Sequence, residues 1–288
     1  MSDQPAARSN PAELPQVSAR WVRMGLRYVP RLVRKHFSAV RLLGGLPDEL
    51  TQGSGEPLLI YMNHPSWWDP VAVAVLTERF FRGRTGYGPI DGKGLEKYRF
   101  MEKLGFFGID PNSRAGAAKF LKVGRAVLET PGAILWVTAE GHFTDPRLRP
   151  VRLRPGVAHL VRKAKRVTVL PLAIEYPFGE EKQPEMRLAF GEPIVVTPPR
   201  TTSSEADASA KDPGRTSAQW NALLERRLTE TMDRLAAATI EQEVEAFTLL
   251  SDGKRGVGGV YDVWRRLKAW ATGKKFDPAH GAEAGRGV

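Results

Sequence analysis

Short apolar runs alternate with helical patterns through the middle of this 288-residue chain. Each run is bounded by Gly, Pro or Asn, as is typical of buried strands. The runs occupy 57–62, 85–90, 106–110, 132–138 and 167–174. Apolar residues recur at helical spacing over 70–82, 95–104, 114–129 and 156–165. This alternation predicts an α/β fold in which helices flank a mainly parallel central sheet, and residues 185–197 could add a late edge strand or a hairpin.

Changes in composition divide the chain further. Residues 198–216 are mostly Pro, Ser, Thr, Ala and charged residues, which indicates a surface loop, and beyond it Trp220, Leu228 and Leu235 mark one face of a long helix. We expect that helix to pack on the α/β domain. The predicted segments are a disordered N-terminus at 1–19, a basic amphipathic helical region at 20–47, the α/β domain at 48–197, a flexible loop at 198–216, the packed helix at 217–250 and a Gly-rich, basic amphipathic tail at 251–288.

The segment 20–43 has the pattern of a two-faced helix. Seven Lys and Arg and no acidic residue lie between Leu14 and Pro47. At about 100° per residue the six arginines of this segment fall in a sector roughly 80° wide, opposite Trp, Tyr and aliphatic side chains. We expect Pro30 to break or restart the helix. The apolar face either enters a membrane interface or packs on the core of the protein, and a face of arginines without acids favours the membrane.

Charge and cysteine content restrict the possible partners and chemistry. The chain has 43 Lys and Arg against 32 Asp and Glu, a net charge of +11, which favours an anionic partner such as nucleic acid, an anionic membrane surface or a phosphate-bearing substrate. No helix-turn-helix, RNP or zinc-finger pattern occurs, so we expect no nucleic acid. There is no Cys, which excludes disulfides and thiolate nucleophiles, and the scattered His and Asp predict no metal site.

Targeting signals are not evident. The first 19 residues lack an apolar run behind a basic start, so we expect no signal peptide and a cytoplasmic location. The longest stretch without Asp, Glu, Lys or Arg has 12 residues, 57–68, well short of the ~20 apolar residues of a spanning helix. We therefore expect the protein to be peripheral on the membrane.

The sequence NHPSWWDP directly follows the predicted strand 57–62 and places His64 and Asp69 at its carboxyl end. Ligands bind at that edge of open α/β sheets. An Asp that accepts from one ring nitrogen of a His leaves the other nitrogen free to take a proton, which is the arrangement of a general base. The alternative is an Asp that caps a helix beside a hydrogen-bonded surface His.

The motif NHPSWWD resembles the first block of the PlsC-type glycerolipid acyltransferases, and three further blocks follow in order as GIDPNSR, AEG and VLPL over 108–172. The resemblance implies transfer of a fatty acyl group from acyl-CoA or acyl-carrier protein to the hydroxyl of a lysophospholipid such as 1-acylglycerol-3-phosphate, in phospholipid biosynthesis or remodelling. It makes His64 the general base and Asp69 its orienter, with Asn63 and Pro171 as supporting motif residues. It implies no metal, no cofactor beyond the acyl thioester and no covalent intermediate.

The resemblance also suggests how an acceptor phosphate is held. It assigns binding roles to Arg114 of the second block and to Glu140 and Gly141 of the third, although Glu140 could instead bond backbone at the site. The third block reads Glu140-Gly141-His142-Phe143 and lacks the Arg of the family pattern. The basic run 147–166, with Arg152 and Arg154, could compensate by receiving phosphate or the nucleotide end of CoA.

Several alternatives remain at this point. Trp67 and Trp68 either line an acyl entrance or only pack, and the basic tail is either a second surface contact or a docking helix. The same dyad could activate water, which would make the protein a thioesterase. An idle membrane-surface protein on the same scaffold would bind lipid without turnover, and acyl transfer to a different lipid-like hydroxyl is also compatible with the motifs.

Overall fold

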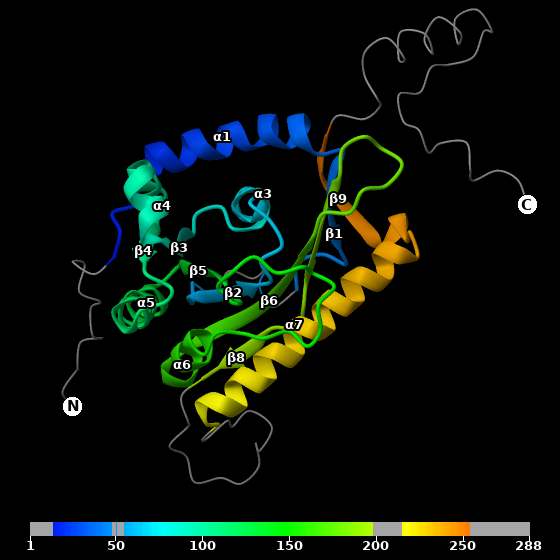
Figure 1. The fold of residues 1–288 in the computed structure, drawn as a ribbon. Helices are drawn as coiled ribbons and strands as arrows, with labels where there is room; N and C mark the ends of the chain where they lie inside the picture. Colours follow the sequence, from blue (N-terminus) through cyan, green and yellow to red (C-terminus); the bar gives the residue numbers. More distant parts are fainter. Residues whose placement is uncertain (1–13, 48–49, 51–54, 198–214, 254–288) are drawn as a thin grey trace, which may run out of the picture.

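A computed structural model describes residues 14–47, 50, 55–197 and 215–253 (Figure 1). Its strands are β1 (Ala39–Leu43), β2 (Leu58–Met62), β3 (Thr85–Asp91), β4 (Phe106–Ile109), β5 (Ala133–Thr138), β6 (Val167–Glu175), β7 (Glu185–Phe190), β8 (Ile194–Val196) and β9 (Phe247–Asp252). Its helices are α1 (Ala19–His36), α3 (Asp69–Phe80), α4 (Gly92–Lys97), η2 (Arg99–Leu104), α5 (Arg114–Leu128), α6 (Gly156–Lys163), α7 (Ser217–Ile240) and η3 (Val244–Ala246).

The strands of the described residues form one mixed sheet in the order β4-β3-β5-β2-β6-β7-β1-β9, with β8 pairing β6 beside β7. The pairs from β4 to β6 and the β1–β7 pair are parallel. The pairs β6–β7, β6–β8 and β1–β9 are antiparallel. The predicted α/β fold with a mainly parallel sheet flanked by helices is confirmed.

Two apolar clusters cover the two faces of the sheet, and β2 contributes to both. Leu59 and Tyr61 lie in the cluster that includes α5, α6 and α7, whereas Leu58, Ile60 and Met62 lie in the cluster that includes α1 and α3. Figure 1 shows the same three layers, with α1 and α3 above the sheet and α5, α6 and α7 below it. Because both faces are covered, every residue of β2 is buried, which explains its continuous apolar sequence.

The N-terminal segment differs from its prediction in two ways. Helix α1 continues through Pro30, whose ring is exposed, while Val29 and Val33 are buried against the domain. Packing on both sides of the proline offsets the hydrogen bond that proline cannot donate. The helix then ends at His36 instead of reaching 43, because Ala39–Leu43 pairs with β7 and β9 as the buried strand β1.

The C-terminal part also differs. Helix α7 ends at Ile240 and not near 250, because Phe247–Asp252 forms the edge strand β9 against β1. Strand β7 lies inside the sheet between β6 and β1 and is not an edge strand. Most of the predicted segments 1–19, 198–216 and 251–288 lie outside the described residues, with only 14–19, 215–216 and 251–253 inside them.

Candidate functional site

Asn63 fixes the start of the turn that carries the candidate base. Its side-chain amide donates to the carbonyl of Ile174 and its side-chain oxygen accepts from the N–H of Ile174, both at 2.9 Å. These bonds extend the link between β2 and β6 past the last backbone pair of the two strands, Met62 with Leu172. The buried amide therefore holds His64 at the carboxyl edge of the sheet.

His64 and Asp69 are in direct contact across this turn. Nδ1 of His64 lies 2.5 Å from Oδ2 of Asp69, the first residue of α3. Asp69 is only 1% exposed, so little water competes for its carboxylate. With Nδ1 engaged as a donor to the carboxylate, Nε2 of His64 is the nitrogen that can accept a proton.

Tyr176 bonds the other carboxylate oxygen, and the sequence analysis missed it. It directly follows β6, and its hydroxyl donates to Oδ1 of Asp69 at 2.8 Å. Burial, and then the neighbouring carboxylate, raises the pKa of Tyr176 well above its usual value. The phenol thus stays protonated and acts as a donor. Its position just past an apolar strand was the only feature of the sequence that could have indicated a role at the site.

Glu140 ties the loop after β5 to the turn after β2. The side chain is 5% exposed, and its Oε2 accepts from the backbone N–H of His64 at 2.9 Å. The N–H of Thr144 in the same loop donates to the carbonyl of His64 at 3.0 Å. Of the two expected roles of Glu140, the bond to backbone is thus observed, and its role in substrate binding stays a prediction.

Two aromatic rings lie beside the base. The ring centroids of Phe143 and His64 are 4.2 Å apart, and those of Phe143 and Trp67 are 6.1 Å apart. Trp67 is 80% exposed and Phe143 is half-exposed, so both are open to a ligand or a lipid. Trp68 instead packs edge-on against Phe37, with centroids 5.1 Å apart. The adjacent tryptophans therefore differ, and only Trp67 remains a candidate for an acyl entrance.

Arg154 joins the second and third sequence blocks. Its guanidinium donates to the carbonyl of Pro111 and, at 3.3 Å, to Oδ1 of Asn112, while its backbone N–H donates to the carbonyl of Ala139. Gly141 lies beneath this side chain at a φ of +73°, and a Cβ at that position would clash with Arg154. The structure thus brings Arg154, Gly141 and the loop before α5 together at the same edge as His64.

The remaining predicted site residues are less closely connected to this edge. Arg114 is the first residue of α5, Arg152 lies on the loop before α6, and both side chains are exposed. Neither has a hydrogen bond or an ion pair within the described residues. Pro171 lies inside β6, paired with Tyr61 of β2, and its carbonyl accepts from the N–H of Gly191. Pro171 is therefore part of the scaffold beneath the site.

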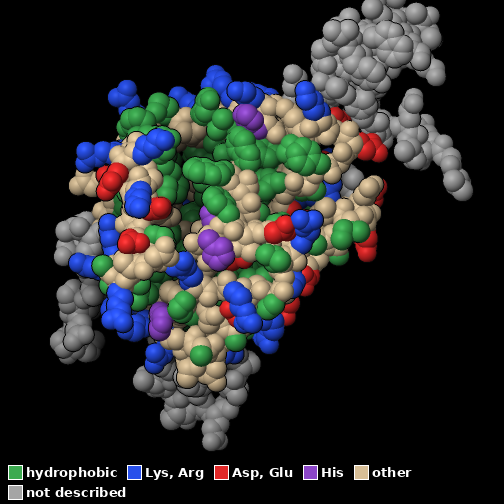
Figure 2. All heavy atoms as spheres, viewed as in Figure 1, with side chains coloured by type: hydrophobic (Ala, Val, Ile, Leu, Met, Phe, Trp, Pro, Cys, Tyr) green, Lys and Arg blue, Asp and Glu red, His purple; other side chains and the backbone are tan. Residues whose placement is uncertain are grey.

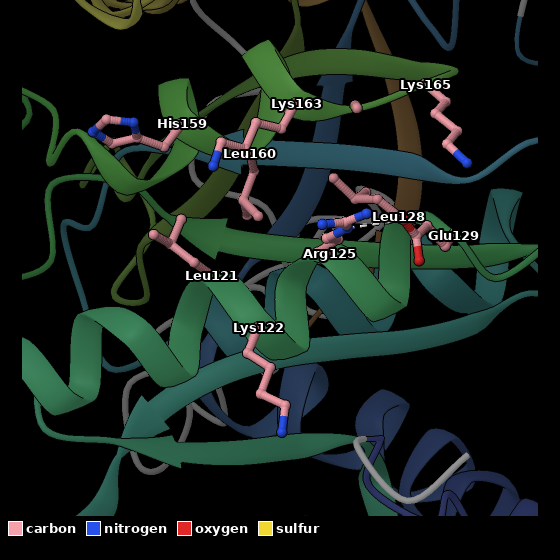
Figure 3. A pocket seen from close by; sticks show the side chains of 10 residues that line it. Leu121, Lys122, Arg125, Leu128, Glu129, His159, Leu160, Lys163 and Lys165 are labelled. Carbon is pink, nitrogen blue, oxygen red and sulfur yellow. Dashed lines mark hydrogen bonds and ion pairs between the residues drawn. The ribbon is translucent and has the colours of Figure 1, made fainter. Parts of the chain in front are cut away.

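A separate hollow lies between α5 and α6 (Figure 3). It is lined by Leu121, Lys122, Arg125, Leu128, Glu129, His159, Leu160, Lys163, Ala164 and Lys165. It is lined by the C-terminal parts of α5 and α6, which lead into the first residues of β5 and β6. The hollow therefore opens toward the edge of the sheet opposite the one that carries His64. This hollow is therefore not part of the candidate site.

Exposed apolar side chains gather on one face of the molecule. Figure 2, in the view of Figure 1, shows hydrophobic side chains gathered on the upper part of this face around a hollow, with one histidine near the top, others below them, and Lys and Arg around them. The described residues contain no group of three or more His, Cys, Asp or Glu that could hold a metal ion. None of the described helices is both long enough and apolar enough to cross a bilayer.

The central part of the chain matches a known protein family. Residues 39–175 match the model of a family described as Acyltransferase. The matched segment runs from the first residue of β1 to the last residue of β6 and includes His64, Asp69 and Glu140. Tyr176 is the first residue beyond it. No curated protein matches the chain.

Proposed function

Residues 39–175 are a domain of the PlsC-type acyltransferase family, and from this premise we propose that the protein moves a fatty acyl group from an acyl thioester to the hydroxyl of a lysophospholipid such as 1-acylglycerol-3-phosphate. The observation that carries the proposal is the contact between His64 and Asp69 at the carboxyl edge of the sheet. The thioester is carried by coenzyme A or by acyl-carrier protein, and the product enters phospholipid biosynthesis or remodelling.

The proposed reaction needs one general base and no covalent catalyst. Asp69 accepts from Nδ1 of His64, and Nε2 takes the proton of the acceptor hydroxyl as its oxygen attacks the thioester carbonyl. The new C–O bond forms, the C–S bond breaks, and the imidazolium returns its proton to the departing thiolate. The buried carboxylate of Asp69 stabilises the imidazolium between these two steps. A thioester is already activated, so no serine or cysteine nucleophile is required.

Arg154 is the best-supported ligand for a phosphate of the acceptor. It is exposed, and the loop before α5 holds its guanidinium through the carbonyl of Pro111 and the side chain of Asn112, which lowers the entropy lost when it binds. A planar guanidinium pairs with phosphate through two parallel hydrogen bonds. Arg114 and Arg152 add positive charge, while Glu140 and Gly141 shape the loop that supports Arg154. We propose this group as the phosphate-binding part of the site.

Phe143 supports a second candidate acceptor. It stands where the third block of the family pattern carries Arg, and its ring covers one face of His64. An aromatic ring in that place favours contact with an uncharged group beside the reacting hydroxyl. Acyl transfer to a different lipid-like hydroxyl is therefore the alternative.

An anionic membrane surface is the proposed partner. Part of the apolar face of α1 packs on the domain, but Trp21, Met24 and Tyr28 remain exposed beside the arginines of the same helix. At the end of α1, the ring of His36 lies 4.7 Å from that of Trp68. Aromatic side chains flanked by arginines are typical of membrane interfaces. A bilayer bound along α1 would thus lie next to the site, where acyl donor and acceptor are both found.

The experiment that tests the function measures free thiol released from a long-chain acyl-CoA, with and without lysophosphatidate, and identifies the lipid product by mass spectrometry. We expect acceptor-dependent release by the wild type and none by His64→Ala. The matched control is His159→Ala, which removes a histidine on α6 that contacts Ser217. Release without acceptor would instead support a thioesterase. No release with a whole lipid extract as acceptor would support an idle scaffold, and both outcomes would overturn the proposal.

A further inference from the structure

Tyr176 extends the contact of the base and its carboxylate into a chain of three side chains. The chain runs from Nδ1 of His64 to Oδ2 of Asp69 at 2.5 Å, and from Oδ1 of Asp69 to the hydroxyl of Tyr176 at 2.8 Å. Within the described residues, the Asp69 side chain has no other hydrogen-bond partner. Each carboxylate oxygen therefore has one fixed donor.

We propose that Tyr176 is a positioning residue for acyl transfer, whose hydroxyl holds the Asp69 carboxylate in the orientation that aligns His64. The inference rests on the proposed function, because positioning has a kinetic effect only where His64 acts as a base. It adds a residue that lies outside the sequence blocks and just past the segment matched by the family. Tyr176 does not touch the reacting atoms and acts through Asp69.

The position of Asp69 explains why a third residue is needed. Asp69 begins α3, and its side chain can rotate about two torsions. At 1% exposure, water cannot satisfy an oxygen that turns away from His64, and an unpaired buried carboxylate oxygen costs the full desolvation free energy of that group. The Tyr176 hydroxyl gives Oδ1 one fixed partner and thus one favoured orientation of the whole carboxylate.

Tyr176 is itself held in place from two sides. Its backbone follows β6 directly, and its ring packs on Phe37, with centroids 5.8 Å apart. Phe37 is fully buried at the end of α1 and also contacts Trp68, one residue before Asp69. The donor and the acceptor of the Tyr176–Asp69 bond are therefore attached to the same aromatic cluster, which keeps the distance between them constant.

The phenol acts as a fixed donor and does not relay a proton. Burial and the adjacent carboxylate raise the pKa of Tyr176 well above its usual value, so it stays neutral during turnover. Two other titratable groups lie near this chain of side chains: Glu140 bonds the backbone N–H of His64, and His36 packs on Trp68, the residue before Asp69. The positive end of the phenol dipole faces Asp69 and weakens the attraction of the carboxylate for an imidazolium.

The test compares wild type, Tyr176→Phe and the control Tyr87→Phe, which removes the hydroxyl of another buried tyrosine with no hydrogen bond in the described residues. For Tyr176→Phe we expect kcat to fall about tenfold, a part of the roughly 10²–10⁴-fold that a general base contributes, with KM unchanged. We also expect the acidic limb of the kcat/KM profile to move to higher pH, because the loss of the phenol dipole favours the imidazolium.

A readout that needs no turnover separates this inference from the proposed function. In protein labelled with ¹⁵N-histidine, the Nδ1 proton of His64 can be assigned by its loss in His64→Ala. We expect its resonance to move in Tyr176→Phe and to stay in place in Tyr87→Phe. An unmoved resonance, or an unchanged kcat and pH profile in Tyr176→Phe, would overturn the positioning role. A wild type without any thiol release would overturn the function, whatever the resonance shows.

Discussion

The ring of Phe143 lies over the ring of His64, with centroids 4.2 Å apart and ring planes at 33°. Phe143 is held there by its loop, in which Glu140 and Thr144 both bond the backbone of His64. The candidate base thus has Asp69 at Nδ1, an aromatic ring on one face and the exposed Trp67 nearby. This arrangement limits the access of water to the base from the side of Phe143.

Phe143→Ala should lower the yield of ester relative to free fatty acid, because opening one face of His64 lets water compete with the acceptor. The ratio of ester to free fatty acid should therefore fall several-fold. The measurement compares thiol release with ester formed in the presence of acceptor. Ile240→Ala, which removes an exposed apolar side chain at the end of α7, should leave the ratio unchanged. An unchanged ratio in Phe143→Ala would mean that the ring does not exclude water.

Glu140→Ala should destabilise the fold by about 1–3 kcal/mol, because it leaves the part-buried backbone N–H of His64 without its acceptor. Glu140→Gln keeps an acceptor oxygen of the same reach, and we expect most of the stability and the KM for the acceptor to be retained. Urea unfolding and steady-state kinetics of the two variants provide the measurements. A large rise of KM in a stable Glu140→Gln protein would show instead that the charge binds the acceptor.

Arg154→Ala should raise the KM for lysophosphatidate about tenfold or more, because a hydrogen bond to a charged group contributes about 1.5–3 kcal/mol. The KM for an uncharged monoacylglycerol should change little. Arg147→Ala, in the same loop, removes an exposed arginine that bonds only Asp145 within the described residues and provides the control. If the KM for acyl-CoA rises instead, Arg154 contacts a phosphate of the donor and the assignment to the acceptor is wrong.

Charge reversal of Arg23, Arg27 and Arg31 to Glu should weaken binding to anionic vesicles, since each basic residue near such a surface contributes about 1 kcal/mol. Sedimentation with vesicles that contain phosphatidylserine measures the effect, which should shrink as salt is added. The control variant reverses the charge of one arginine on each of α5, α6 and α7, namely Arg125, Arg162 and Arg226. It changes the net charge by the same amount and should weaken vesicle binding less. Equal losses in the two triple variants would indicate attraction by net charge without a role for α1.

The sequence alone determined most of the central domain. The runs at 57–62, 85–90, 106–110, 132–138 and 167–174 predicted five strands of the sheet because strands buried on both faces need continuous apolar residues. The contact between His64 and Asp69 could also be anticipated, since the two residues are five apart across one turn. These features depend on neighbours in the chain, which a sequence displays directly.

Only the tertiary structure decided the features that depend on distant residues. Tyr176 reaches Asp69 across 107 positions, and Asn63 meets Ile174 across 111. The sequence predicted helix for the segments that form β1 and β9, because their short apolar patterns also fit a helix. They form strands because β1 pairs with both β7 and β9. Pro30 remains inside α1 because packing on the domain outweighs local propensity. In each case the stabilising partner lies far away in the sequence, so the local pattern cannot reveal it.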